Sequence, residues 1–523
     1  MSEQHTAFPL SHASAELTAT PVGVDDLPAD DSIPKAKGAS AWPKLVEAAK
    51  WAFSFPAMLG AGIVARVFYE GRTFFVDPDV WWHIKVGNDI LRTHHFPTTD
   101  PYSWTVAGHP WMAYEWLGEI PFALVSRFGG VLALDIFLIA FSSLIMLLVY
   151  WLASMRAKNS KAGFVSAGIL CSIAFASFTL RPQMFGSLFL VLTLIILLKF
   201  RQGVSWPIWL LPALFLAWIN IHGSFIIGLG VLALTLCAGL YSFQLGNVEA
   251  VAWTRKQRLQ LETVLLLCIA VLPITPYGTK LAVYPFDIAF SQPVNLANVI
   301  EWKPMPFELL GGKIFLGLVV LFVALQILFR FTWRLEEIIL AIGGIAMACL
   351  HVRFVLLFVP FFAPVFATML AKWLPPYKRS IDKYALNAIL MTAAVVAMIY
   401  YRPTHKSIEL AVSKQYPVGA VKYLREHPVP GKMLNTYGYG GYLVGQGIPT
   451  FIDGRGDLFE RGGVFADYVH LTQFKPGAFG VLRNYDISVC LLDRDEPMST
   501  ALLESPKWQR AYVDGTSAVF VRR

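Results

Sequence analysis

Long apolar runs alternate with short polar connections along most of the chain. The runs are roughly 16 to 22 residues long, which is the length that a helix needs to cross the hydrocarbon core of a bilayer. We therefore expect a polytopic α-helical membrane protein with about 11 transmembrane helices. The expected spans are 51–70, 131–154, 163–180, 184–200, 206–220, 223–243, 260–275, 313–331, 335–350, 354–371 and 385–401.

Composition supports this class and excludes others. Hydrophobic residues make up 56% of the 523 residues and charged residues only 15%, whereas a soluble domain is about half apolar and a quarter charged. The net charge of +8 is spread over the loops and forms no basic stripe interleaved with aromatic residues, so we expect no nucleic-acid partner. None of the five cysteines has CxxC spacing, and neither a disulfide framework nor a zinc site is indicated.

Basic residues are concentrated in alternate loops. By the positive-inside rule these loops, and with them the N-terminal tail, face the cytoplasm. An odd number of spans then places everything after residue 402 outside, and we expect an integral protein of a bacterial inner membrane with a periplasmic C-terminal domain. The basic loops are 156–161, 199–201, 255–258, 330–334 and 372–383.

The chain therefore divides into three parts. Residues 1–47 are polar and are expected to form a disordered cytoplasmic tail. Residues 48–402 form the membrane domain, with two long outer loops at 71–130 and 276–312. Residues 403–523 have the composition of a small extracytoplasmic α/β domain, whose expected strands are KMLNT, TFIDG, SVCLLD, QRAYVD and SAVFVRR, with a hairpin turn at Asp514-Gly515.

Carboxylates gather among tryptophans in the first outer loop. A carboxylate in a partly desolvated cleft can act as a general base on a hydroxyl group. We rank Asp79 first for this role, Asp77 second and Glu115 third. Alternatively, Asp79 is a helix N-cap, or Asp77 and Asp79 bind a divalent cation such as Mg²⁺ or Mn²⁺, although no fixed metal-ligand spacing is present.

Cationic side chains occur at the outer ends of several spans, where short loops should be poor in them. They are Arg181, His222, His351 and Arg353, and His83 in the first loop adds a further ring. Ionisable groups at this depth are costly, and a guanidinium group binds phosphate oxygens bidentately, so we expect a phosphate-binding cluster. The alternative is that these side chains reach lipid headgroups or pair with nearby carboxylates, Glu301 among them.

The C-terminal part contributes candidates for contact with an acceptor. Tyr439 and Tyr442 lie in a glycine-rich turn, and Asp453 and Arg455 follow an apolar strand pattern. Closely spaced glycines allow the backbone to approach a ligand, but a tight strand-to-helix turn explains them equally well. Asp453 and Arg455 could also simply pair with each other.

The first outer loop resembles that of a known family. The pattern is similar to the first loop of the protein mannosyltransferases and the lipid A aminoarabinose transferases, members of the GT-C superfamily of membrane glycosyltransferases. About eleven spans and an outer soluble domain are also similar to that superfamily. The matching residues are Asp79, Trp82-His83, Gly87, Ile90, Pro97, Asp100, Pro110-Trp111 and Trp116.

This resemblance implies inverting transfer of a sugar from a polyprenyl-phosphate carrier to an acceptor that is a protein, a lipid or a glycan. A first-loop aspartate, Asp77 or Asp79, would assist the acceptor. Outer cations or a divalent metal would stabilise the departing polyprenyl phosphate. The turn Tyr437–Tyr442 loosely resembles the WWDYG region of oligosaccharyltransferases, but it lacks the two tryptophans and the aspartate.

Two other functions fit parts of the pattern. A transporter or flippase of a lipid-linked or anionic solute would also place cations at the interface, although internal repeats and broken mid-membrane helices are not evident. A non-catalytic subunit in cell-envelope assembly would use the outer part to bind a partner. Burial of the first-loop carboxylates in structural salt bridges, with no cavity beside them, would favour this third function.

Overall fold

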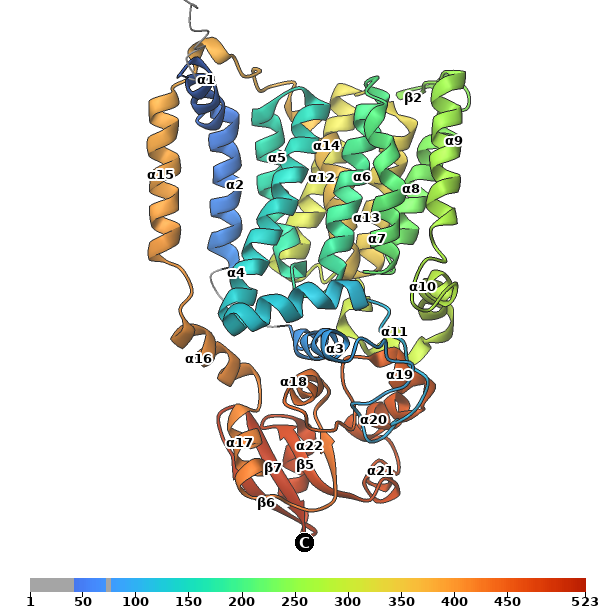
Figure 1. Ribbon diagram of the computed structural model, residues 1–523, viewed down its shortest axis with the longest axis vertical. Helices are drawn as coiled ribbons and strands as arrows, with labels where there is room; N and C mark the ends of the chain where they lie inside the picture. Colours follow the sequence, from blue (N-terminus) through green and yellow to red (C-terminus); the bar gives the residue numbers. More distant parts are fainter. Residues whose placement is uncertain (1–41, 72–76) are drawn as a thin grey trace, which may run out of the picture. The chain divides into compact units, whose positions relative to one another are not determined.

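The computed structural model describes residues 42–71 and 77–523. Helices run side by side through the middle of the structure (Figure 1). They are α2 (Phe55–Gly71), α4 (Trp116–Ala157), α5 (Ser160–Ala174), α6 (Gln183–Arg201), α7 (Leu211–Ile219), α8 (Phe225–Ala238), α9 (Arg255–Ala270), α12 (Leu310–Phe329), α13 (Leu335–Leu350), α14 (Val355–Leu370) and α15 (Tyr384–Tyr400).

A helix lies at each of the expected spans, but not every helix is a clear span. By length and composition, four helices of the described residues can cross a membrane, or six if two bent helix pairs each count as one span. Three further apolar helices, α5, α8 and the stretch that ends in α7, are shorter than a bilayer requires. The structure therefore supports a helical membrane protein, while the count of eleven spans is not confirmed.

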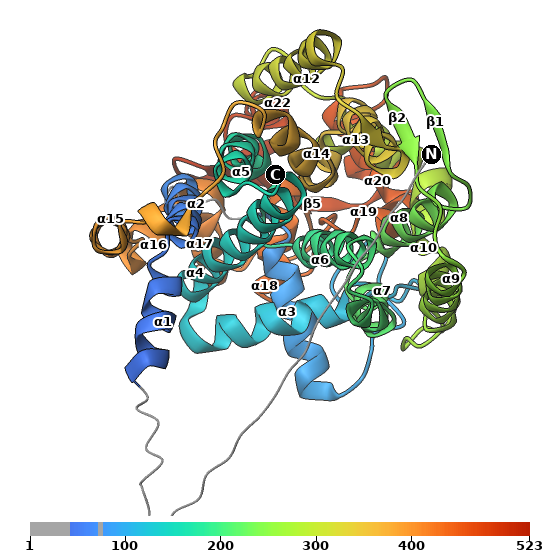
Figure 2. The ribbon, with the colours of Figure 1, turned by 90° about the horizontal axis from the view of Figure 1, so that it is seen from above.

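Helices α4, α5 and α14 pack together near the centre of the bundle, as the view along the helices shows (Figure 2). The rings of Phe358, Phe362 and Phe366 on α14 stack in succession at this centre. Helix α15 lies at the edge beside α2 (Figure 2). Most of its large apolar side chains are exposed, as expected for a helix that faces lipid.

The expected tail, residues 1–47, lies mostly outside the described residues. Residues from 42 onward form helix α1 (Trp42–Ala52).

The first outer loop contains helix α3 (Val80–Thr93) and the beginning of α4. Helix α4 bends at Gly129 and Gly130, whose backbone angles are not helical, with φ of +58° at Gly130. Its first part lies across the end of the bundle, and only the part after the bend runs along the bundle (Figure 1). At Gly87 of α3 a Cβ atom would lie 2.4 Å from the Glu119 carbonyl oxygen, so glycine permits this close crossing of α3 and α4.

The second outer loop is also largely helical. It comprises α10 (Lys280–Ser291), α11 (Pro293–Asn298) and the 3-10 helix η3 (Ile300–Trp302). Its end is tied to the turn between α13 and the 3-10 helix η4 (Val352–Phe354), because Met305 N–H donates to Cys349 O and Val352 N–H donates to Lys303 O. These bonds fix η3 beside η4.

The C-terminal segment, residues 403–523, carries a four-stranded mixed sheet of order β4-β5-β7-β6. Strand β4 pairs with β5 in parallel, and the other pairs are antiparallel. The elements are α16 (His405–Gln415), α17 (Val418–Glu426), β4 (Lys432–Asn435), α18 (Gly440–Gly445), α19 (Gly456–Arg461), α20 (Val464–Thr472), α21 (Phe479–Asn484), β5 (Ile487–Asp493), α22 (Pro497–Leu503), β6 (Trp508–Val513) and β7 (Ser517–Arg522).

Two expectations for this segment have different outcomes. The turn at Asp514-Gly515 joins β6 to β7, as expected. The stretch TFIDG at 450–454 is not a strand of this sheet; instead Thr450 forms one isolated bridge with Ser103 of the first outer loop. Residues 50–523 form one compact unit, so the C-terminal segment packs against the outer loops and is not separate from the membrane part.

Basic loops meet at the bundle end opposite the C-terminal segment. Strands β1 (Phe243–Leu245), β2 (Val248–Ala250) and β3 (Trp333–Arg334) form a small sheet there. Ion pairs join Arg156 to Glu337 and Arg201 to Glu336. Strand β2 and the start of α9 lie at the end of the structure opposite strands β5, β6 and β7 (Figure 1).

Candidate functional site

The first-loop carboxylates are placed by a tight turn that starts α3. Val80 N–H donates to Asp77 O, and Asp79 N–H donates to Asp77 Oδ1 over 2.9 Å. Asp79 occupies the N-cap position, but its side chain forms no capping bond. Asp79 is therefore at the expected N-cap position, but its carboxylate does not cap the helix. This leaves the carboxylate available for other contacts.

Arg181 lies at the centre of three carboxylates. Its Nε donates to Asp77 Oδ2 over 2.8 Å, one terminal nitrogen lies 2.9 Å from Asp79 Oδ2, and the other lies 2.6 Å from Glu301 Oε1. Glu301 comes from η3 of the second outer loop. The cluster therefore joins the first outer loop, the start of α6 and the second outer loop around one guanidinium group.

A second group of side chains adjoins this cluster around Glu115. His83 Nδ1 lies 3.2 Å from Glu119 Oε1, and its Nε2 lies 3.8 Å from Glu115 Oε2. His222 Nε2 lies 3.6 Å from Glu115 Oε1. The start of α4 is held at this place because Leu117 N–H and the Trp116 indole N–H both donate to Asn220, two residues before His222.

Small residues allow these elements to approach closely. A Cβ atom at Gly118 would lie 2.8 Å from the Pro182 side chain and 3.2 Å from that of Ile221. Those two residues follow Arg181 and precede His222. Without a side chain at Gly118, the beginning of α4 can reach both span ends, which brings Glu115 close to the cations.

Arg353 and His351 both contact Trp302. Arg353 is the one arginine of the predicted set for which no ion pair occurs within the described residues. Its guanidinium lies 4.1 Å from the centre of the Trp302 ring. His351 Nδ1 donates to Trp302 O over 2.5 Å. His351 therefore positions Trp302, and Trp302 in turn supports Arg353.

Burial controls the charge states in this site. It raises the pKa of Glu115 to about 8, although Arg181 and Arg353 act in the opposite direction. Burial and then Arg353 lower the pKa of His222 to about 3, and burial, Arg181 and His222 lower the pKa of His83. At pH 7 Glu115 is therefore mainly protonated and both rings are neutral.

Asp79 has the pKa of a group that can exchange a proton near neutrality. Burial raises the pKa of its carboxyl to about 7 against the lowering effect of Arg181, and Asp77 and Glu301 raise it further. Both Asp77 oxygens accept hydrogen bonds, one from Asp79 N–H and one from Arg181. This difference separates the two aspartates: Asp77 holds the turn and Arg181, and Asp79 is the better base.

The C-terminal segment covers Asp79. A Cβ atom at Gly454 would lie 1.7 Å from Asp79 Oδ1 and 3.0 Å from the Trp82 indole nitrogen, and one at Gly441 would lie 2.0 Å from Pro78 O. These distances are far below van der Waals contact. At Gly441 the neighbouring atom is backbone, so that position requires glycine, whereas at Gly454 a Cβ atom would displace the Asp79 carboxylate. The backbone around Gly454 is part of the wall of the candidate site.

Asp453 and Arg455, expected on the acceptor side, lie in a buried ion triad. Arg455 Nη1 contacts Asp100 Oδ1 over 2.5 Å, and its Nε and Nη2 contact Asp453 over 2.8 and 2.6 Å. All three side chains have 0% exposure. The triad fastens the C-terminal segment to the first outer loop, and neither Asp453 nor Arg455 presents a surface to an acceptor.

Tyr439 and Tyr442 are also buried. The Tyr439 hydroxyl donates to Thr516 O over 3.0 Å, and the Tyr442 ring stacks on Tyr416 and meets the edge of Trp81. Their contacts are those of packed core residues. The structure therefore separates the predicted acceptor-side residues from the predicted catalytic and phosphate-binding residues, which do come together.

Several residues at the site were not among the predicted candidates. From the sequence, Glu301 is expected only as a pairing partner, and Gly454 and Asp457 are not candidates. In the structure, burial raises the pKa of the Asp457 carboxyl to about 6. The signal was the polar run Asp453–Asp457 directly after an apolar stretch, together with an acidic residue beside a tryptophan at 301–302.

The carboxylates do not fit a metal site. Asp77, Asp79 and Glu301 are the oxygen ligands that a divalent cation would prefer, but the Arg181 guanidinium lies among them at hydrogen-bond distance. Within residues 42–71 and 77–523, His, Cys, Asp and Glu form no group of three or more that could hold a metal ion. The positive charge at this place belongs to the protein itself.

Comparison with known proteins returns only distant structural similarity. No family model and no curated protein matches the chain. The structure is similar to the Archaeoglobus fulgidus oligosaccharyltransferase tethered with an acceptor peptide containing the NVT sequon, with a TM-score of 0.48, 12% identity and coverage of 88% of this chain and 70% of that chain. The structure is also similar to the oligosaccharyltransferase AglB of the same organism, in complex with an inhibitory peptide and a dolichol-phosphate. The TM-score is 0.47 and the identity 12%, and the match covers 83% of this chain and 69% of that chain.

The structure is also similar to ArnT from Cupriavidus metallidurans bound to undecaprenyl phosphate. The TM-score is 0.46 and the identity 12%, and the match covers 92% of this chain and 98% of that chain. These are proteins of the GT-C superfamily, which the first-loop pattern resembles. At these TM-scores and this identity the similarity concerns general architecture and assigns no role to any residue. The function proposed next rests on the geometry of the site.

Proposed function

We propose that the protein transfers a sugar from a polyprenyl-phosphate carrier to an acceptor at the outer face of the membrane. The observation that carries this proposal is the contact of Asp79 with Arg181 at the end of a span. The pKa of the Asp79 carboxyl is about 7, and a second cation, Arg353, lies on the ring of Trp302, next to Glu301 of the same cluster. Such an arrangement combines a base for a hydroxyl group with cations for a leaving phosphate.

In the proposed reaction, Asp79 accepts the proton of the acceptor hydroxyl. The acceptor oxygen forms a bond to the anomeric carbon of the sugar while the bond from that carbon to the phosphate oxygen breaks. The phosphate leaves with the electron pair, and a single displacement inverts the anomeric centre. Asp77 acts as a positioning residue, because it holds both the Asp79 backbone and Arg181.

The leaving phosphate is assigned to Arg353 first and Arg181 second. Arg353 has no ion pair among the described residues, and its place on the Trp302 ring leaves the guanidinium edge free for phosphate oxygens. Arg181 contacts three carboxylates, so the phosphate has to compete with Glu301, the most exposed of them. Neutral His222 and protonated Glu115 add hydrogen-bond donors without adding charge.

The test uses the full chain purified and reconstituted in proteoliposomes with polyprenyl-phosphate-linked sugars extracted from bacterial membranes. We expect polyprenyl phosphate to be released, and the labelled sugar to appear on an acceptor fraction from the same membranes. Movement of the intact lipid-linked sugar across the bilayer without breakage of the sugar–phosphate bond would contradict transfer and support the flippase alternative.

One observation favours a second candidate function. Three carboxylates around Arg181 are also what a purely structural cluster contains, which fits a non-catalytic subunit of cell-envelope assembly. That function predicts no release of polyprenyl phosphate in the same assay, and it predicts that a protein partner co-purifies with the chain from detergent-solubilised membranes.

Removal of divalent cations should not affect the proposed reaction. Because the Arg181 guanidinium lies among Asp77, Asp79 and Glu301, we expect the wild-type protein to show no tight Mn²⁺ binding in an electron paramagnetic resonance titration. We also expect EDTA to leave the transfer rate unchanged. Arg181→Met exposes three carboxylates to one another and should create an Mn²⁺ site, which the further change Asp79→Asn removes. One tight Mn²⁺ site in the wild-type protein that is lost in Asp79→Asn would contradict this assignment.

A methyl group at Gly454 should disable the site without loss of the fold. It would displace the Asp79 carboxylate from Arg181, since the added Cβ atom lies 1.7 Å from Asp79 Oδ1. A shift of about 1 Å in a catalytic group can cost about 10²-fold in rate, and we expect a fall of that order for Gly454→Ala. Gly438→Ala is the matched control, because nothing lies within 4 Å of its added Cβ atom. Equal transfer rates for the two variants would show that the Gly454 contact does not matter.

A further inference from the structure

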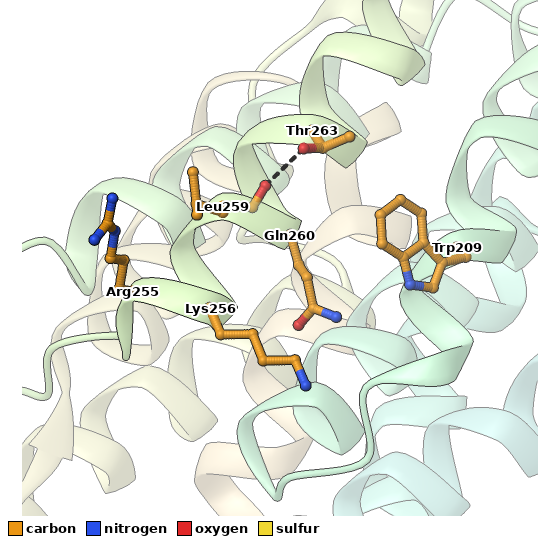
Figure 3. Close-up of a pocket in the computed structure, with 6 residues that line it drawn as sticks. All are labelled: Trp209, Arg255, Lys256, Leu259, Gln260 and Thr263. Carbon is orange, nitrogen blue, oxygen red and sulfur yellow. Dashed lines mark hydrogen bonds between the residues drawn. The ribbon is translucent and has the colours of Figure 1, made fainter.

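A hollow of about 490 Å³ lies between α9 and the 3-10 helix η2 (Trp206–Leu210), away from the candidate site. Its lining is Trp209, Arg255, Lys256, Leu259, Gln260 and Thr263 (Figure 3). The start of α9 is at the bundle end opposite the C-terminal segment, where the basic loops meet (Figure 1). Nothing in the proposed reaction uses this place.

Two cations of the hollow are uncompensated. Arg255 and Lys256 form no ion pair with any residue in the described part of the chain, whereas Arg258 on the same helix contacts Glu262 over 2.9 Å. Arg255 and Lys256 also lie in the first turn of α9, which contains no acidic residue. Positive charge is unfavourable there, because the helix dipole already makes that end positive. An anion bound in the hollow would compensate the charges of Arg255 and Lys256 and the positive end of the helix dipole.

Exposed apolar side chains adjoin the cations. Leu259 and Trp209 of the lining are exposed, and so are Leu266 and Ile269 farther along α9, outside the hollow. In Figure 3 the Gln260 side chain points into the space that separates Lys256 from the Trp209 ring. The Thr263 hydroxyl donates to Leu259 O and so adds little polarity to the wall. A soluble anion would gain nothing from this apolar stripe, but an acyl chain would cover it.

We propose that this hollow binds the phosphate headgroup of an anionic phospholipid from the leaflet opposite the candidate site, with its acyl chains along the exposed stripe of α9. The observations that carry the proposal are the two unpaired cations, the exposed apolar wall and the interfacial tryptophan. Cations near a membrane surface attract anionic lipid headgroups. Tryptophan is the ring that membrane proteins place at the headgroup level. The proposal does not depend on the proposed transfer reaction.

The experiment measures lipid retention by native mass spectrometry of the full chain in detergent with phosphatidylglycerol or phosphatidylcholine. We expect the wild-type protein to retain phosphatidylglycerol preferentially. Loss of both cations in Arg255→Gln/Lys256→Gln should weaken this retention by about tenfold or more. Arg258→Gln is the matched control, because that cation is already paired, and it should retain the lipid as the wild-type protein does.

A second variant keeps both charges and fills the space. Gln260→Trp should weaken phosphatidylglycerol retention although Arg255 and Lys256 remain. Equal retention in the double variant and in Arg258→Gln would overturn the proposal, as would equal retention of the two lipids by the wild-type protein. Displacement of phosphatidylglycerol by millimolar inorganic phosphate would overturn the assignment to a lipid, because a soluble anion would then suffice.

Discussion

Asp79→Asn should abolish most of the sugar transfer while leaving the fold intact. The substitution keeps the size of the side chain and can still contact Arg181, but an amide cannot accept the proton of the acceptor. General-base catalysis is worth about 10²- to 10⁴-fold, and we expect the transfer rate in proteoliposomes to fall within that range. Asp89→Asn is the control on the same helix, because Asp89 pairs at the surface with Lys85 and Arg92.

The pH profile provides a readout that a purely structural role would not change. Because burial raises the pKa of Asp79 to about 7, the active carboxylate form predominates only above that pH. For the wild-type protein kcat/KM should therefore rise with pH and level off above about 7, and the residual rate of Asp79→Asn should lack this rise. Full activity in both Asp79→Asn and Asp77→Asn would exclude the first-loop aspartates as the base.

Arg455→Gln should produce the largest loss of stability. It leaves Asp100 and Asp453 buried at 0% exposure without their cation. Removal of one partner from a buried ion cluster typically costs about 3–5 kcal/mol, and the cost falls on the junction between the first outer loop and the C-terminal segment. We expect the variant to have a lower thermal transition temperature than the wild-type protein. We also expect its amide hydrogens to exchange faster than in the wild-type protein, with the largest increase in residues 450–461.

Arg522→Gln is the matched control for this change. Its ion pair with Asp486 is exposed, and such pairs contribute about 0–1 kcal/mol. Replacement of Asp100 by Asn in the Arg455→Gln background should recover part of the lost stability, because one uncompensated charge is removed. Equal transition temperatures for Arg455→Gln and Arg522→Gln would show that the triad does not fasten the two parts.

The ion pairs of the candidate site are compatible with the proposed reaction. Arg181 fixes Asp77, Asp79 and Glu301 in place before any substrate arrives, so little reorganisation is required when a phosphate enters. Arg353 supplies the cation that is not already engaged in an ion pair within the described residues. Gly454 and the Arg455 triad then set the position of the C-terminal segment over Asp79.

The sequence by itself determined the helical membrane class and the clustering of basic residues in alternate loops, and it indicated the carboxylates of the first outer loop and the cations at the span ends as site candidates. These follow from local signals, namely apolar run length and the cost of charges near a bilayer. Only the tertiary structure decided that Arg181 lies among three carboxylates, that His351 holds Trp302, and that Asp453 and Arg455 form a buried ion triad with Asp100. Those outcomes depend on contacts between residues far apart in the sequence, from 49 positions for Trp302 and His351 to 355 for Asp100 and Arg455, and no local pattern encodes such pairings.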